Sequence, residues 1–204
     1  MEKLNLYRTN TDYVNYLWKF TKNDDFQVKF NEKDGNFRTY IGLFSIKNIN
    51  YLIPLASAPP YKTKYYSMHE RPDFMKIEHK NKLKSVIDIG FMIPVPNGLL
   101  NIIDIDNEPP NNKHILTLEQ HYIRKREEEI MENIKQTYNR VSKGRKYKNN
   151  RDKLVERCLN FPLLEQKMLE YQSSKEIIKT SSIAHIFKNE EIIGGKDLEV
   201  LDIK

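Results

Sequence analysis

Residues 39–46 and 51–55 read Thr-Tyr-Ile-Gly-Leu-Phe-Ser-Ile and Tyr-Leu-Ile-Pro-Leu, and Lys-Asn-Ile-Asn joins them at 47–50. Both runs are rich in β-branched and aromatic residues, so they predict two strands of a hairpin with a short polar connection. Pro54 has no amide hydrogen to donate to a neighbouring strand, and we expect it at a strand end or on a sheet edge. This hairpin favours a fold built on an antiparallel sheet.

Further strands are expected on both sides of the hairpin. The predicted strands cover residues 5–8, 85–93 and 99–105, and two polar stretches, 23–36 and most of 56–84, are typical of loops. Between the first strand and the hairpin, Asn10 or Thr11 is placed to cap a helix. The apolar positions of that helix are Tyr13, Val14, Leu17 and Phe20.

The second half of the chain has helical periodicity. Residues 117–120 read Thr-Leu-Glu-Gln, a capping-box pattern that predicts the start of a long helix ending at Gly144. Residues 153–159 predict another helix, and Asn160 is placed to cap a third one that runs through Tyr171. The apolar stripe of the long helix consists of Ile123, Ile130, Ile134, Tyr138 and Val141.

Strands that precede helices in this way are typical of an α+β domain. We therefore predict one domain over residues 1–172, with a C-terminal extension at 173–204 for which the pattern indicates no particular structure.

The composition is that of a globular protein with an excess of positive charge. Apolar residues make up 39% of the 204 residues, charged residues make up 30%, and the net charge is +6. Such a charge suits a polyanionic partner, although many ordinary proteins are equally basic. Cys158 is the only cysteine, so no internal disulfide can form, and no stretch resembles a signal peptide or a membrane-spanning helix. We expect a cytoplasmic protein.

Several common enzyme motifs are absent from the sequence, which has no glycine-rich phosphate loop, no Cys-x-x-Cys and no His-Glu-x-x-His. His79 and His121 are better explained as surface or packing residues than as ligands or bases. Asp104, Asp106 and Glu108 alternate near a strand end and have the ligand type that Mg²⁺ prefers, but solvated turn acids are the favoured interpretation. We expect no metal and no cofactor.

The stretch from Ala56 to Lys64 leaves a strand and presents a hydroxyl and two ammonium groups close together, from Ser57, Lys62 and Lys64. Cleavage of RNA without metal needs a ribose 2′-hydroxyl aligned with phosphorus, positive or hydrogen-bonding groups on the phosphorane, and charge stabilisation of the leaving oxygen. Serine and lysine supply the second need, and a lysine of depressed pKa supplies the third. A solvated basic loop remains the alternative.

Positive charge is concentrated at 62–84, with seven basic and three acidic residues, and at 143–153, with six basic and one acidic residue. Tyrosines are interleaved with these charges, and cations beside aromatic rings are what single-stranded RNA requires. The predicted RNA-contacting residues are Tyr61, Tyr65, Lys76, Lys80, Lys82, Arg145, Lys146 and Lys148. Basic loops rich in tyrosine also occur in proteins that bind no nucleic acid.

Four segments, in order along residues 4–171, resemble the ToxN/AbiQ family of toxins from type III toxin–antitoxin and phage-abortive systems. The segments are Tyr40-Ile41-Gly42 through Tyr51-Leu52-Ile53-Pro54-Leu55-Ala56-Ser57; Asp73-Phe74-Met75-Lys76-Ile77; Met92-Ile93-Pro94-Val95-Pro96 with Leu99-Leu100 and Ile103-Asp104; and Glu119-Gln120 through Ile123, joined by Asn160-Phe161 and Leu163-Leu164-Glu165-Gln166-Lys167.

The resemblance implies a strongly twisted antiparallel sheet with surrounding helices, similar to the MazF/Kid toxins. It also implies a metal-independent endoribonuclease that cuts adenine-rich RNA and leaves a 2′,3′-cyclic phosphate and a 5′-hydroxyl. The implied partner is a repeated RNA pseudoknot, which blocks the active groove, forms a closed assembly with the toxin and is processed by it from a repeat precursor.

The family's site residues map onto this sequence one by one. The active-site serine falls on Ser57, while the adjacent hydroxyl position holds Ala56. Lys62, with Lys64 in reserve, takes the place of the family lysine. Arg38 matches a basic residue that precedes the Ile-Gly strand and is expected to contact phosphate. The family also has a site tyrosine upstream of this strand. This sequence has no clear counterpart to it, and Phe30 or Asp34 lies near the corresponding position.

Two other hypotheses stay open at this point. The missing hydroxyl at Ala56 is compatible with a non-catalytic RNA-binding module. A MazF-like RNase toxin that is neutralised by a small acidic protein is the second alternative.

Overall fold

The computed structural model describes residues 4–24, 26–33, 36–57, 68–145 and 152–175. The chain divides into two compact units, Met1–Met168 and Leu169–Lys204. In the second unit, residues 169–175 are helical. The proposed domain boundary after residue 172 stays a prediction. Among the described residues, no helix combines the length and the apolar character needed to span a membrane.

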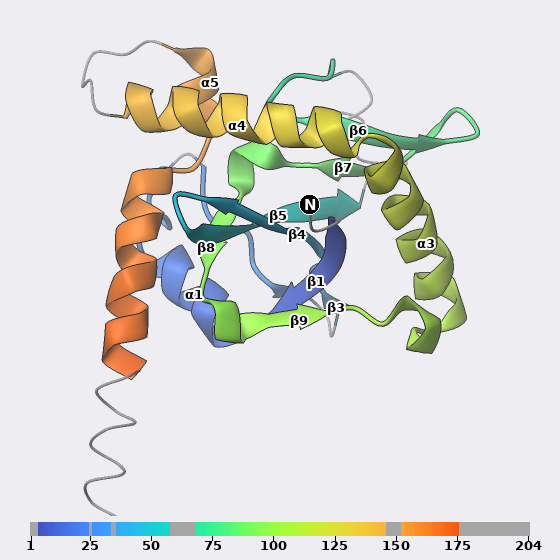
Figure 1. Cartoon of the computed structure of the whole chain (residues 1–204), viewed down its shortest axis with the longest axis horizontal. Coiled ribbons are helices and arrows are strands. Elements are labelled where there is room, and N and C mark those ends of the chain that lie inside the picture. Colours follow the sequence, from blue (N-terminus) through green and yellow to red (C-terminus); the bar gives the residue numbers. More distant parts are fainter. Residues whose placement is uncertain (1–3, 25, 34–35, 58–67, 146–151, 176–204) are drawn as a thin grey trace, which may run out of the picture. The chain divides into compact units, whose positions relative to one another are not determined.

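An antiparallel sheet forms the centre of the first unit (Figure 1), with strands in the order β6-β7-β5-β4-β1-β9 and with β8 paired to β5. Its strands are β1 (Asn5–Thr9), β4 (Tyr40–Ile46), β5 (Ile49–Ser57), β6 (Met75–His79), β7 (Lys82–Ile87), β8 (Ile93–Val95) and β9 (Leu100–Ile102). The sheet is open, with β6 and β9 as its edges. Together with the helices it confirms the predicted α+β class.

The β4–β5 hairpin is confirmed, but the expectation for Pro54 is wrong. Pro54 lies inside β5, which has strand neighbours on both sides. The Leu55 amide donates to the Thr39 carbonyl on the β4 side, so the backbone groups of Pro54 point the other way. On that side β8 pairs with residues 50–52 and β7 with residues 55–57. The missing amide hydrogen therefore falls at the gap between two partner strands.

Gly42 is required in β4 by a close approach of side chains from two neighbouring strands. A Cβ atom at this position would lie 2.7 Å from Leu52 Cδ2 and 3.0 Å from Tyr7 Cδ2. The pairing between β4 and β5 also shifts register between Ile41 and Phe44. The glycine of the Ile-Gly pair thus leaves room for side chains from β1 and β5.

Helices follow the first strand and the last strand, in the order that the sequence predicted. They are α1 (Thr11–Lys19), α3 (Pro110–Lys125), α4 (Glu127–Gly144), α5 (Lys153–Arg157) and a further helix at residues 161–175. Asn10 caps α1 as predicted, because its side chain accepts from the Tyr13 amide. Asn160 likewise accepts from the Leu163 amide. Of the four apolar positions, Tyr13, Val14 and Leu17 are buried, whereas Phe20 caps the end of α1 and is 38% exposed.

The predicted single helix from Thr117 to Gly144 is wrong in two respects. The helix begins earlier, at Pro110, whose ring occupies the first turn where no amide bond is needed. The Thr117 hydroxyl donates to the Lys113 carbonyl within α3 and so caps nothing. At Arg126 the backbone leaves the helical region, and α4 starts after it. All five positions of the predicted apolar stripe are buried, but Ile123 belongs to α3 and the other four to α4.

Two short hairpins lie in stretches that the sequence predicted as loops. One joins β2 (Glu32–Lys33) to β3 (Asn36–Phe37), and the other joins β6 to β7. In the second, Lys80 and Asn81 take positive φ values of 50° and 59°, the left-handed backbone of a two-residue turn. The predicted strand at 85–93 starts at Lys82 and stops at Ile87.

Short 3-10 turns replace the ends of two predicted strands. They are η1 (Ile89–Phe91), η2 (Asn97–Leu99) and η3 (Ile105–Asn107). The strand predicted at 99–105 is therefore limited to β9.

Candidate functional site

Ser57 is the last residue of β5, and its side chain is exposed at the end of the strand. Its backbone pairs with Ser85 of β7. The preceding residue, Ala56, packs against the apolar cluster of Phe74, Leu83 and Val86. Because successive residues of a strand point to opposite faces, the hydroxyl that is missing at Ala56 would not lie beside that of Ser57.

Arg38 lies just before β4 and reaches across to β5. Its amide donates to the Asn31 carbonyl at 2.6 Å, its Nε to the Phe30 carbonyl at 3.0 Å, and one terminal nitrogen to the Leu55 carbonyl at 3.2 Å. Leu55 precedes Ser57 by two residues, about 7 Å of strand. Arg38 is therefore bonded to the backbone near the end of β5, and its guanidinium has N–H groups beyond the two that bond these carbonyls.

Tyr40 follows Arg38 by two residues and is buried under the same strands, with 2% of its surface exposed. Burial raises the pKa of its hydroxyl above the ordinary value, and the positive charge of Arg38 opposes that shift only in part. Tyr40 is therefore neutral at physiological pH and does not act as a phenolate beside the strand end.

Behind the strand end lies a buried carboxyl that the sequence analysis did not single out as a site residue. Glu119 of α3 is 5% exposed, and burial raises its pKa to about 7, with a smaller opposing effect from the Ser85 hydroxyl. Ser85 is itself buried and is the pairing partner of Ser57. The sequence position of Glu119 could have revealed this buried carboxyl, because Glu119 lies on the buried stripe of α3 between Leu116 and Ile123.

Lys76 is not brought to the face that Ser57 occupies. Lys76 and Ala56 both pair with Val86, so these three side chains share one face of the sheet. The Lys76 amide donates to the Glu70 carboxylate at 2.7 Å. Burial alone would raise the pKa of Glu70, but hydrogen bonds from Arg126 and from this amide hold it below its usual range. Lys76 thus lies beside Glu70, a carboxylate that also pairs with Arg126.

Lys80 and Lys82 flank the tip of the β6–β7 hairpin, and both are exposed. Lys82 precedes Ser85 by three residues, which corresponds to about 10 Å along β7. Lys82 therefore lies on the strand that pairs with the end of β5, and Lys80 lies in the turn before it. Their contact with RNA stays a prediction.

Arg145 has structural partners in the part of the chain that is described. One terminal nitrogen donates to the Val155 carbonyl at 3.0 Å and to the Cys158 carbonyl at 2.8 Å, which caps the end of α5. Its predicted contact with RNA stays a prediction. Six other predicted site residues lie outside the described residues: Tyr61, Lys62, Lys64, Tyr65, Lys146 and Lys148.

The acids considered as magnesium ligands each have another partner. The Asp104 carboxylate accepts from the Asp106 amide and caps η3. Asp106 pairs with Lys113 at 2.8 Å, and Glu108 pairs with Arg8 at 2.7 Å. Over the described ranges, no three His, Cys, Asp or Glu side chains come close enough to hold a metal ion.

Known proteins match this chain over nearly all of the first unit. Residues 5–169 match the family model of toxin ToxN of type III toxin–antitoxin systems. The chain is 24% identical over 184 residues to the endoribonuclease ToxN of Bacillus thuringiensis subsp. kurstaki, an alignment that covers 87% of this chain and 90% of that protein.

Solved structures share the fold. One, from a bacterial type III system whose toxin is selectively inhibited by a non-coding RNA pseudoknot, has a TM-score of 0.70 at 22% identity over 84% of this chain and 99% of that one. AbiQ, a lactococcal anti-phage endoribonuclease, has a TM-score of 0.67 at 22% identity, with coverage of 84% and 99%. A third, from a bacterial antiviral system regulated by a processed non-coding RNA, has a TM-score of 0.64 at 26% identity, covering 81% and 98%.

Proposed function

This chain belongs to the ToxN family of toxins from type III toxin–antitoxin systems, and from that membership we propose that it is an endoribonuclease toxin held in check by RNA. The observation that carries the proposal is the family match over residues 5–169, which includes the exposed strand end at Ser57 and the arginine clamped beside it. The relatives named endoribonucleases, ToxN and AbiQ, support the same activity.

In the proposed reaction the ribose 2′-hydroxyl gives its proton to solvent water and its oxygen attacks the adjacent phosphorus. A bond between phosphorus and the 2′-oxygen forms, and the bond between phosphorus and the 5′-oxygen breaks. The Ser57 hydroxyl donates to a non-bridging phosphate oxygen, and the Arg38 guanidinium offsets the charge that grows there. Lys62, with Lys64 in reserve, supplies a proton to the leaving 5′-oxygen. The products are a 2′,3′-cyclic phosphate and a 5′-hydroxyl, and no metal takes part.

The proposed inhibitor is a repeated RNA pseudoknot that occupies the groove in which RNA is cleaved. The toxin cuts this RNA from its precursor. An RNA pseudoknot inhibits the toxin of one structural relative, which supports this partner. The proposed RNA contacts are Lys76, Lys80, Lys82, Arg145, Lys146, Lys148, Tyr61 and Tyr65. We place the toxin and its RNA in the cytoplasm. Residues 173–204 are expected to be dispensable for cleavage.

The test is incubation of the purified full-length chain with adenine-rich RNA in the presence of EDTA. We expect cleavage to continue at an unchanged rate, with products that resist 5′-phosphatase and carry cyclic-phosphate ends. A strict requirement for Mg²⁺, or products with 3′-hydroxyl ends, would refute the proposed chemistry.

The non-catalytic alternative keeps one observation in its favour, which is the absence of a hydroxyl at Ala56. It predicts tight binding of RNA without cleavage and without growth arrest when the protein is expressed. Cleavage that is lost on Ser57→Ala would exclude it.

A further inference from the structure

A pocket of about 470 Å³ opens between α1 and the segment that leads into β2. Its lining residues are Thr11, Asn15, Trp18, Lys19, Phe30 and Glu32. The volume lies in the range of about 300–1,000 Å³ that is usual for small-molecule sites. The pocket includes Phe30, which lies near the place of the family's upstream tyrosine, and none of its lining residues is Ser57, Arg38 or a predicted RNA contact.

Two aromatic rings form one wall of this pocket. The ring centroids of Trp18 and Phe30 are 5.1 Å apart, and the planes are tilted by 36°. The Trp18 indole N–H points to the Gln27 side-chain oxygen at 3.4 Å. Phe30 is 55% exposed, the largest exposed fraction of any described phenylalanine. An exposed ring beside a half-buried one is the arrangement on which proteins stack an unpaired nucleobase.

The polar groups of the pocket suit the edge of a base better than a phosphate. The Glu32 carboxylate would repel a phosphate, but it accepts a hydrogen bond from an exocyclic amino group. The Asn15 amide both donates and accepts, as the ring nitrogen and amino group of a purine edge require. Lys19 is exposed at the rim, where a flanking phosphate would find a counter-charge.

Hydrogen bonds connect the pocket to β5, the strand that ends at Ser57. Arg38 bonds the Phe30 carbonyl through Nε and the Leu55 carbonyl through a terminal nitrogen, so one guanidinium joins the aromatic wall to β5. Asn31 is 1% exposed, and its amide bonds the Thr9 carbonyl and the Thr11 hydroxyl. Phe30 and Glu32, on either side of Asn31, are therefore held at fixed places relative to α1 and to the strand end.

We propose that this pocket binds one unpaired purine base of the RNA strand, stacked on Phe30 and Trp18, with its amino group donating to Glu32. The assignment rests on the proposed function, and it adds a specificity site to it. A base held here orients the strand through Lys19 and Arg38 toward Ser57. A pyrimidine would cover less of the aromatic wall.

Trp18 is the only tryptophan of the chain, so its fluorescence reports on this pocket directly. The full-length protein is titrated with adenosine 5′-monophosphate, guanosine 5′-monophosphate, uridine 5′-monophosphate and ribose 5-phosphate. We expect saturable quenching by the two purine nucleotides, at least about fivefold weaker binding of the uridine nucleotide, and no quenching by ribose 5-phosphate.

The cleavage assay gives the second readout. Phe30→Ala should raise KM for RNA about 5- to 100-fold with little change in kcat, because stacking is lost while the reacting groups stay in place. Phe37→Ala is the matched control, since Phe37 is 50% exposed in β3 of the adjoining hairpin but is not a lining residue of the pocket. Glu32→Gln should narrow the preference for purine over pyrimidine nucleotides about fivefold or more.

The outcomes separate this inference from the proposed function. If the wild-type chain cleaves RNA but Phe30→Ala leaves KM unchanged and no nucleotide quenches Trp18, the base pocket is refuted and the nuclease stands. If no RNA is cleaved but purine nucleotides quench Trp18 and Phe30→Ala abolishes the quenching, the pocket stands without the nuclease. Equal quenching by ribose 5-phosphate would also refute it, because the site would then recognise phosphate.

Discussion

The two ends of strand β5 have opposite environments. At the turn end, Tyr51 is fully buried, its ring stacks on Phe44 at 6.0 Å, and its edge meets Tyr138 and Phe161. At the other end, Ala56 is half-buried and Ser57 is exposed, with Arg38 bonded to the backbone two residues away. One strand thus passes from the aromatic core of the fold to the candidate reaction centre.

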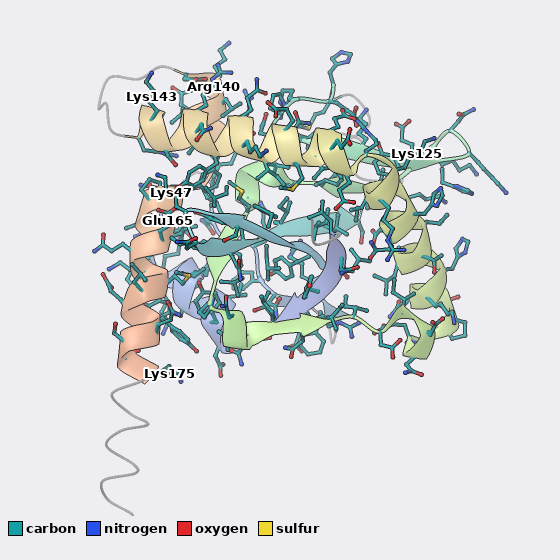
Figure 2. All side chains as sticks on the ribbon, viewed as in Figure 1. Lys47, Lys125, Arg140, Lys143, Glu165 and Lys175 are labelled. Carbon is teal, nitrogen blue, oxygen red and sulfur yellow. The ribbon has the colours of Figure 1, made fainter. Side chains whose placement is uncertain are left out.

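The polar groups at the two ends differ in the same way. The hydroxyls of Tyr51 and Tyr138 both donate to the Glu165 carboxylate, the second at 2.7 Å, and the Lys47 ammonium lies 5.4 Å from the Tyr138 ring centroid (Figure 2 labels Lys47 and Glu165). Burial raises the pKa of Tyr51 far above its ordinary value. These contacts stabilise the fold, whereas the Ser57 end presents a hydroxyl and a cation to solvent. We therefore expect substitutions to affect either stability or cleavage, according to the end of β5 at which they fall.

The largest effect is expected at the core end. Tyr51→Ala removes a fully buried aromatic ring and should lower the free energy of unfolding by about 3–5 kcal/mol, measured by urea denaturation. Tyr51→Phe keeps the ring and should cost about 1–3 kcal/mol, because Glu165 loses one of its two phenolic donors. If Tyr51→Phe kept the wild-type stability but abolished cleavage, the core end of β5 would affect cleavage and not stability, contrary to this expectation.

Ser57→Ala should act in the opposite way. We expect cleavage of RNA to fall about 100- to 1,000-fold, the usual effect of removing one donor to a developing oxyanion, while the free energy of unfolding changes by less than about 0.5 kcal/mol. Ser45→Ala is the matched control, since Ser45 is also exposed on the sheet but lies near the turn between β4 and β5. Equal activity of the two variants would remove Ser57 from the reaction.

The buried carboxyl behind the strand end provides a test by pH. The pKa of Glu119 is raised by burial from 4.5 to about 7, so the folded protein binds this proton more tightly than the unfolded chain. Stability should therefore fall as pH rises from about 4.5 to about 7, by up to about 3 kcal/mol. Glu119→Gln should remove this slope in urea titrations, and Glu128→Gln, at an exposed position of α4, should retain it. A slope that survives in Glu119→Gln would assign it to other groups.

The smallest effect is expected at the β6–β7 hairpin. Lys82→Gln combined with Lys80→Asn, which tolerates the left-handed backbone of that turn, should weaken RNA binding uniformly across sequences and reduce the salt dependence of log K by about one for each lysine. Lys135→Gln, on the exposed face of α4, serves as the control. An unchanged salt slope in the double variant would place the RNA path elsewhere.

Much of the fold was predictable because local patterns determine it. Two runs rich in β-branched and aromatic residues predicted the β4–β5 hairpin. Asn10 and Asn160 predicted helix starts through bonds that span only three residues. The errors arose where distant partners decide the outcome. The interior position of Pro54 depends on the gap between β8 and β7, and the helical break at Arg126 coincides with its bonds to Glu70, which is 56 residues away.

The same division holds for the site. The sequence by itself determined the family, the class of fold and the choice of Ser57 and Arg38, because these follow from residue types and their order. Only the tertiary structure decided that Arg38 joins Phe30 to β5, that Lys76 faces away from Ser57, and that Glu119 lies buried behind the strand end. The physical reason is that strand register and helix packing, which set these relations, depend on contacts between segments far apart in the chain.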